Sequence, residues 1–80
     1  MVPVTGTVRS VDGRPVEGVL VMGADLNYAE TDPLGRFTLP RPELALFFWC
    51  TGFRPTAHVL KGERSVNVTL RPTISVRTTA

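Results

Sequence analysis

Clusters of glycine and proline interrupt this chain about every eight to twelve residues, and their spacing constrains the fold more than any other feature. Between the clusters, apolar and polar side chains alternate with a period of two, which is the pattern of a half-buried strand. No window repeats apolar residues at the intervals of three and four that mark a helix. The sequence therefore predicts an all-β protein.

About seven segments carry this strand pattern, and tight turns separate them. Asp32, Pro33 and Gly35 stand at the first, second and fourth positions of a four-residue turn, where a type I turn favours these residue types. Asp12 and Gly13 predict a second tight turn. We expect an antiparallel β-sandwich, because strands with one polar face pack on one side only. Its strands should cover 4–10, 16–25, 26–31, 36–39, 44–50, 56–60 and 65–70.

The inward face of each strand follows from the alternation. In segment 36–39, for example, Phe37 and Leu39 share one face. The core should be small, because a chain of this length buries only roughly 60% of its unfolded surface. The expected core consists of Val4, Val8, Val16, Val19, Val21, Phe37, Leu39, Leu46, Phe48, Cys50, Val59, Val66, Val68 and Leu70.

The 80 residues make one domain, which we place at 1–72, with 73–80 as a C-terminal tail or an extra edge strand. The net charge is only +2, and the basic residues are scattered rather than arranged along a phosphate-binding stripe. The longest apolar run, 44–50, is far shorter than the ~20 residues of a membrane-spanning helix. We expect neither nucleic-acid binding nor membrane insertion.

The compartment is not identified by these residues. The chain starts without the basic and apolar segments of a signal peptide, and the lone Cys50 excludes an internal disulfide. A piece of a longer secreted or surface protein would be extracytoplasmic, and otherwise the chain would be cytoplasmic.

Three sequence elements follow one another over roughly residues 4–70: Gly6-x-Val8 with Asp12-Gly13-x-Pro15-Val16-x-Gly18-Val19-x-Val21, then Thr31-Asp32-x-x-Gly35-x-Phe37-x-Leu39, and Leu46-x-Phe48-x-Cys50-x-Gly52-Phe53-x-Pro55. In this order they resemble the carboxypeptidase regulatory-like domain, a family of transthyretin-like, or prealbumin-like, β-sandwiches. The resemblance implies a transthyretin-like or Ig-like Greek key fold and a non-enzymatic accessory module beside an enzyme, a receptor or a surface protein.

The apolar segment 44–50 is the most informative candidate site. Its alternation leaves Phe47 and Trp49 on the outer face, where neighbouring aromatic side chains indicate a contact surface. We expect a protein contact there, either with a neighbouring domain or with a second copy, and Tyr28 is the third candidate residue.

The outward aromatic residues are also compatible with two alternatives. Trp49 could stack on a sugar, which would make the chain a carbohydrate-binding module. Alternatively, the tail could fold back and cover the aromatics through Ile74 and Val76, or adjacent strands could shield them.

No group of residues predicts catalysis. His58 is the only histidine, has no placed partner and should point outward. The 5-hydroxyisourate hydrolases of the transthyretin-like fold use several His and Arg residues and a terminal Tyr-Arg-Gly-Ser, whereas this chain ends in Val-Arg-Thr-Thr-Ala. We therefore do not expect that activity, and a small hydrolase of the transthyretin-like fold is kept only as the less favoured alternative. We expect Cys50 to be a core residue rather than a nucleophile.

We also expect no metal, cofactor or internal cross-link. Asp25, Asn27, Glu30 and Asp32 lie within eight residues, but the segment lacks the glycine and the closing glutamate of a calcium loop. The only lysine, Lys61, falls in a predicted hairpin loop, away from the buried position that the isopeptide bond of collagen-adhesin B-type domains requires.

Overall fold

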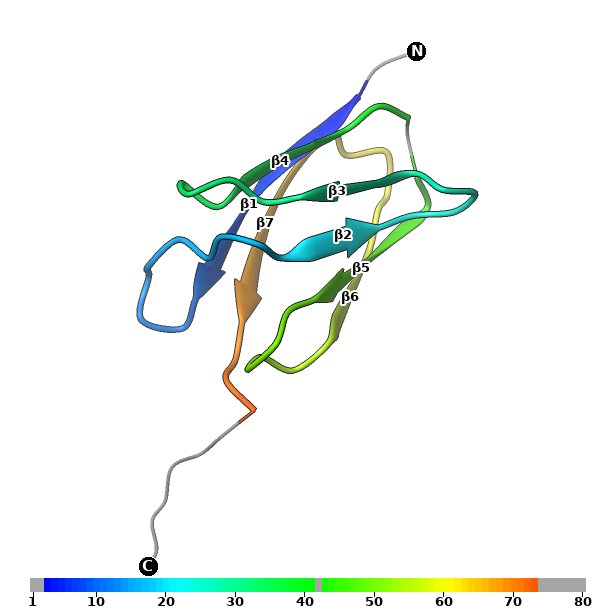
Figure 1. Cartoon of the computed structure of the whole chain (residues 1–80). Helices are drawn as coiled ribbons and strands as arrows, with labels where there is room; N and C mark the ends of the chain where they lie inside the picture. The colour runs from blue at the N-terminus through cyan, green and yellow to red at the C-terminus, as the bar shows by residue number, and fades with distance from the viewer. Residues whose placement is uncertain (1–2, 42, 74–80) are drawn as a thin grey trace, which may run out of the picture.

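The computed structural model describes residues 3–41 and 43–73, which form seven strands and no helix (Figure 1). Two sheets pack against each other around one core, so the predicted all-β sandwich is confirmed. The expected bounds hold for 4–10, 36–39 and 65–70, and the other strands are shorter than expected. The strands are β1 (Val4–Ser10), β2 (Leu20–Met22), β3 (Tyr28–Glu30), β4 (Arg36–Leu39), β5 (Ala45–Trp49), β6 (Thr56–Val59) and β7 (Ser65–Leu70).

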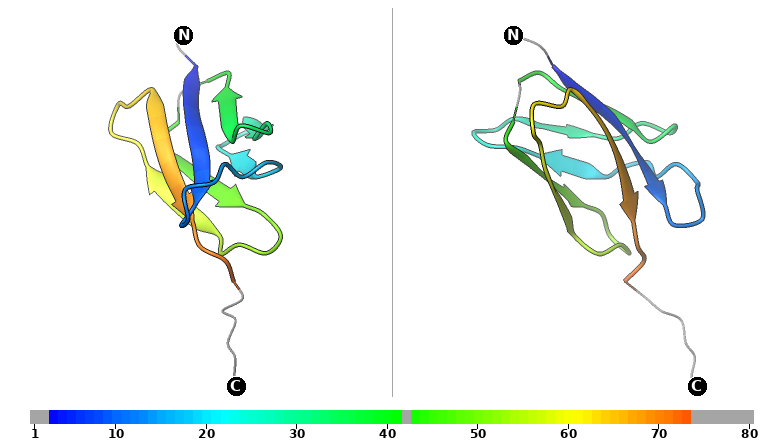
Figure 2. Two further views of the ribbon diagram at one scale, coloured as in Figure 1. Left: turned by 90° about the vertical axis from the view of Figure 1, so that its left-hand side faces the viewer. Right: turned by 180° about the vertical axis from the view of Figure 1, so that it is seen from behind.

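One sheet has the strand order β4-β1-β7, and the other has the order β3-β2-β5-β6 (Figure 2). Antiparallel pairs dominate, as predicted, and the exception is the parallel pair of β1 and β7. A short hairpin can join only antiparallel strands. β6, which precedes β7 in the chain, lies in the opposite sheet. No hairpin therefore joins β7 to a neighbouring strand of its own sheet, and β7 can run parallel to β1.

The core lies between the sheets and contains every predicted residue except Cys50 and Val59. Phe37 of β4 and Phe48 of β5 meet across it, with ring centroids 5.8 Å apart and an interplanar angle of 68°. This edge-to-face contact joins the two sheets and adds to the burial of both rings.

The predicted core was wrong at the end of β6. Val59 is 64% exposed, and Leu60, which follows the strand, is buried instead. Leu46 pairs with His58 in the register of β5 and β6, so His58 lies on the inner side and Val59 on the outer side. The faces of a strand exchange when the register shifts by one residue, and the sequence did not fix that shift. Cys50 is half-buried at the margin of the core.

Gly6 permits the close approach of three strands in the sheet β4-β1-β7. A Cβ atom at this position would overlap the carbonyl oxygen of Val66 and would come within 2.7 Å of the Phe37 ring. Because one of these neighbours is backbone, a larger residue would displace β7 from β1.

Candidate functional site

The outer face of the sheet β3-β2-β5-β6 carries apolar side chains on all four strands. Cross-strand pairing aligns Tyr28, Met22, Phe47 and Ala57 in one row across the sheet. Side chains that are directly opposite on neighbouring strands share a face and contact one another. We call this surface the apolar face, and it consists of Leu20, Met22, Tyr28, Ala45, Phe47, Trp49, Ala57 and Val59.

The apolar face is open to solvent over the described residues. Tyr28 is 60% exposed, Phe47 54% and Trp49 50%. An aromatic side chain spans roughly 150–250 Å², so these three alone present an area of about 300 Å², the size at which patches on a monomer are often functional.

A shallow groove of about 350 Å³ runs along the aromatic residues of the apolar face. Its wall is formed by Met22, Phe47, Phe48, Trp49, Pro55, Thr56 and Ala57, among which Thr56 has the only hydroxyl-bearing side chain. Such a lining suits an apolar side chain of a partner better than a polar ligand.

The structure brings the three predicted site residues together, because Met22 pairs with both Tyr28 and Phe47. Sequence reasoning missed Leu20, Met22, Ala57 and Val59 as members of this face. The alternation around Val21 placed Leu20 and Met22 on one side, but only the strand register shows which residues they join. The proposed cover by Ile74 and Val76 falls outside the described residues.

A larger groove, of about 510 Å³, lies beside the sheet β4-β1-β7 and has a mixed polar lining. Several of its polar side chains already have partners: Arg36 Nε lies 3.7 Å from Asp32, and the Thr7 hydroxyl donates to Asn67 Oδ1 at 2.6 Å. We assign no ligand to this groove.

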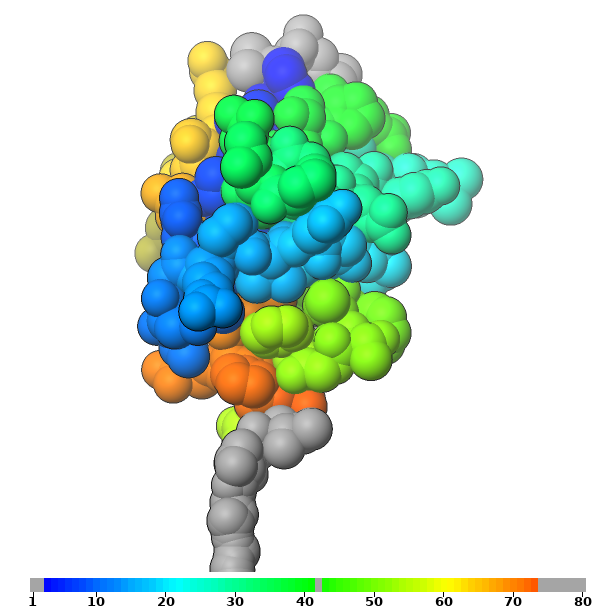
Figure 3. Space-filling model, turned by 60° about the vertical axis from the view of Figure 1, so that its left-hand side comes forward, coloured from blue at the N-terminus to red at the C-terminus, as the bar shows by residue number. Residues whose placement is uncertain are grey.

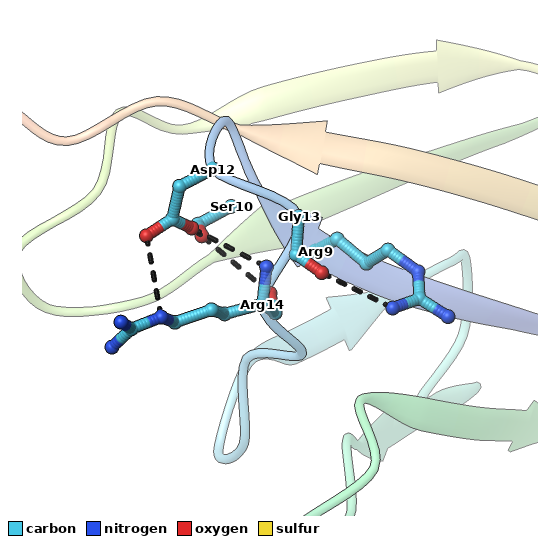
Figure 4. A network of polar contacts seen from close by, with 5 residues as sticks. All are labelled: Arg9, Ser10, Asp12, Gly13 and Arg14. Atoms are coloured by element: carbon cyan, nitrogen blue, oxygen red, sulfur yellow. Dashed lines mark hydrogen bonds and ion pairs between the residues drawn. The ribbon is translucent and has the colours of Figure 1, made fainter.

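Two turns beside the sheet β4-β1-β7 hold their aspartates by hydrogen bonds. Asp12 accepts bonds from the Ser10 hydroxyl and from the Arg14 N–H, and Arg14 Nε lies 3.6 Å from its carboxylate (Figure 4). The Ser10 bond is the main cause that lowers the pKa of Asp12. The predicted turn is confirmed, since the Gly13 N–H donates to Ser10 O at 2.9 Å.

Asp32 plays the same part in the turn before β4. Its carboxylate accepts from the N–H groups of Arg36 at 2.8 Å and Leu34 at 2.9 Å. The bond from Arg36 is the main cause that lowers the pKa of Asp32. The Gly35 N–H donates to Asp32 O at 2.8 Å and Gly35 has a φ of 76°, so the predicted turn is confirmed here too. Both aspartate side chains therefore stabilise the turns in which they lie.

His58 does have a carboxylate neighbour, which the sequence did not show. Its Nε2 lies 3.4 Å from Glu63 Oε1, on the inner side of β6 rather than outward as expected. In the described part of the chain no Ser, Thr or Cys side chain hydrogen-bonds to either residue. Among the described residues, the pair is therefore not hydrogen-bonded to a nucleophile of the kind that a Ser-His or Cys-His hydrolase uses.

The four oxygen-bearing residues of segment 25–32 do not meet. Asn27 is buried, and its amide donates to Arg41 O at 3.0 Å and to the Glu43 carboxylate. Glu30 stands on the outer face of β3, and Asp32 serves its turn. Over residues 3–41 and 43–73, no group of three or more His, Cys, Asp or Glu side chains could hold a metal ion.

Thr31 is a second buried polar residue that the sequence did not indicate. Its hydroxyl donates to Val16 O at 2.7 Å and accepts from the Val19 N–H at 2.9 Å. These bonds fix the segment before β2 against the end of β3 and satisfy two backbone groups inside the protein.

The fold and this surface define a small all-β sandwich with an apolar outer face. No protein-family model and no curated protein matches the sequence. Within the described ranges there is no helix of the length and apolar character that crossing a membrane requires.

Proposed function

We propose that this domain is a non-enzymatic interaction module, which binds a neighbouring domain or another protein through the apolar face. The observation that carries the proposal is the exposure of Phe47 and Trp49 on adjacent outward positions of β5, with exposed Tyr28 on the same face beyond Met22. Burial of apolar area contributes about 25 cal/mol per Å², and aromatic residues are enriched at the centres of protein interfaces. The resemblance to the carboxypeptidase regulatory-like domain supports the same accessory role.

The composition of the face favours a protein over a carbohydrate. Sugar hydroxyls need several polar side chains beside a stacking ring, and the groove at Trp49 offers only the hydroxyl of Thr56 next to that ring. Glu30, at the end of the Leu20–Trp49 row, is the one charged side chain in these rows. A partner would therefore bring an apolar surface with few charges.

The first test places a photo-crosslinking amino acid at position 47 and, as the matched control, at Thr7 on the outer face of the other sheet. Irradiation in a cell extract should give a discrete protein adduct from position 47 and none from position 7. Equal labelling from both positions, or labelling from position 7 alone, contradicts the proposal.

The second test replaces both aromatics, as Phe47→Ser with Trp49→Ser. The double variant should keep its circular dichroism spectrum and its cooperative unfolding, because both side chains already face solvent. It should lose the adduct formed from a crosslinker at Tyr28. Titration of the unaltered protein with oligosaccharides provides the contrast, since Trp49 is the only tryptophan. A saturable change in its fluorescence would favour the carbohydrate-binding alternative.

A further inference from the structure

The turn between β2 and β3 holds two residues in the left-handed backbone region. Asp25 has a φ of 51° and Leu26 has a φ of 65°. The Asn27 N–H closes the turn by donating to Ala24 O at 3.0 Å. Positive φ at both central positions defines a type I′ turn, which favours asparagine, aspartate and glycine there. Aspartate therefore suits the first position, whereas leucine at the second is an outlier, because its Cβ crowds the backbone.

Leu26 is also the most exposed large apolar side chain in the described part of the chain, at 89%. The turn lies at the end of the hairpin that projects from the body of the molecule (Figure 3). Glycine at this position would relieve the backbone strain and would remove an apolar side chain from water. Neither packing nor backbone geometry within the domain explains a leucine here. Strain that persists at such a residue points to a function outside the fold.

Polar contacts with the segment before β5 hold the turn in place. Asn27 is buried, and its amide donates to Arg41 O at 3.0 Å and to the Glu43 carboxylate. The Ala24 N–H donates to Glu43 Oε1 at 3.1 Å, and the Arg41 guanidinium donates to Asp25 O at 2.7 Å. The turn is therefore fastened on both sides of its tip, and presenting the tip to a partner costs little ordering entropy.

Two further exposed side chains connect Leu26 with the apolar face. Tyr28, a member of the apolar face, follows Leu26 by two residues and lies on β3. Leu44 is 84% exposed and directly follows Glu43, the residue that contacts the turn. This end of the sheet β3-β2-β5-β6 therefore presents a projecting apolar tip beside the apolar face.

We propose that Leu26 is the anchor of the interaction and inserts into an apolar pocket of the protein that covers the apolar face. The inference rests on the proposed function, since it identifies the residue that gives that contact its specificity. An exposed leucine contributes most to binding where a pocket removes its whole side chain from water. The partner is therefore a protein with a concave apolar site.

The charge beside Leu26 indicates what surrounds that pocket. Asp25 is exposed, and over the described residues its carboxylate has no hydrogen bond or ion pair, since Arg41 contacts only its backbone carbonyl. A partner with a Lys or Arg side chain at the rim of the pocket would complement this charge. A second copy of the chain fits less well, because the groove on its apolar face has no basic residue in its wall. An anionic membrane surface would repel the carboxylate.

The first experiment compares two exposed leucines in tight turns. Leu26→Gly should raise the midpoint of thermal unfolding by several degrees, because glycine adopts a positive φ without strain. Leu34→Gly is the matched control, since Leu34 is exposed in the turn before β4 and is not among the residues with positive φ. The control should lower the midpoint, because glycine adds conformational freedom to the unfolded chain. A midpoint that falls in both variants contradicts the strain at Leu26.

The second experiment places a diazirine analogue of leucine at position 26 of the full chain and, as the control, at position 34. In a cell extract, position 26 should crosslink to the same protein as a crosslinker at position 47. Position 34 should give no adduct with that protein, because it lies in the turn before β4, in the other sheet.

Competition then measures what the anchor contributes. Unlabelled chain is added to the chain that carries the crosslinker at position 47, and the concentration that halves the adduct is determined. Leu26→Gly should need a roughly tenfold higher concentration than the unaltered chain, whereas Leu26→Met, of similar volume, should stay within about threefold. Asp25→Asn should need roughly threefold more, and this difference should vanish at high salt.

The outcomes distinguish this proposal from the proposed function. If Leu26→Gly competes as well as the unaltered chain, Leu26 is not the anchor, and the apolar face still binds the partner. An adduct from position 26 that depends on Leu26, with none from position 47, contradicts the proposed function and retains the pocket contact. No adduct from either position contradicts both. Crosslinks between two copies, or flotation with phosphatidylserine vesicles that Leu26→Gly abolishes, would identify a different partner and overturn the proposal.

Discussion

The two sheets share one core but have outer faces of opposite character. On β1, β4 and β7 the outward residues are all polar, and we call them the polar face: Thr5, Thr7, Arg9, Arg36, Thr38, Ser65, Asn67 and Thr69. The apolar face of the other sheet presents aromatic and aliphatic side chains at the equivalent positions. In Figure 3 the hairpin of β2 and β3, cyan to teal, also projects beyond the body of the molecule.

The contrast between the two outer faces distinguishes residues that the fold requires from residues that it does not require. Both sheets bury alternate residues in the same core, and the polar face shows that hydroxyl-rich outward positions are compatible with this fold. Nothing in the inner packing therefore requires Phe47 or Trp49 to be aromatic. Their presence on an open face fits a contact that forms outside the domain.

The largest expected effect compares two adjacent phenylalanines of β5. Phe48 is 1% exposed, so Phe48→Ala should lower the free energy of unfolding by about 3–5 kcal/mol. Phe47→Ala should cost less than about 1 kcal/mol, because its ring is already half in water. Urea unfolding of both variants measures the difference. Similar losses would mean that the apolar face belongs to the core, which would end the contrast between the faces.

A smaller effect tests whether the polar face is simply solvated. Thr31→Val should lower the free energy of unfolding by about 1–3 kcal/mol, since the Val19 N–H and Val16 C=O lose their buried partner. The same change at Thr38, which is exposed on the polar face, should stay within about 0.5 kcal/mol. Thermal unfolding compares the pair, and a marked loss at Thr38 would show that the polar face is covered.

The smallest effect concerns acid and the two turn aspartates, which flank the sheet that bears the polar face. The pKa of each is lower in the folded state, so each stabilises the protein fully above the ordinary aspartate pKa of about 3.9. That contribution is lost as the pH falls below 3.9 through the folded pKa. Stability should decline over this range, and Asp32→Asn should make the decline shallower. Unfolding midpoints between about pH 2 and pH 6 measure it, and an unchanged slope in the variant contradicts the assignment.

The sequence by itself determined the all-β class, the turns at 10–13 and 32–35, and the outward position of Phe47 and Trp49. These features are local: the two-residue period comes from the strand backbone, and each turn from a few residues with defined preferences. The inward residues of β1, β4, β5 and β7 follow for the same reason, since their alternation is regular.

Only the tertiary structure decided how distant segments meet. The register of β6 turned Val59 outward and brought His58 towards Glu63, and the crossover from β6 made β7 parallel to β1. It also buried Asn27 and Thr31 against backbone groups remote in the chain. Strand pairing joins residues far apart in sequence, and a one-residue shift exchanges the faces of a short strand. The alternation within a single strand does not predict its register with a neighbouring strand.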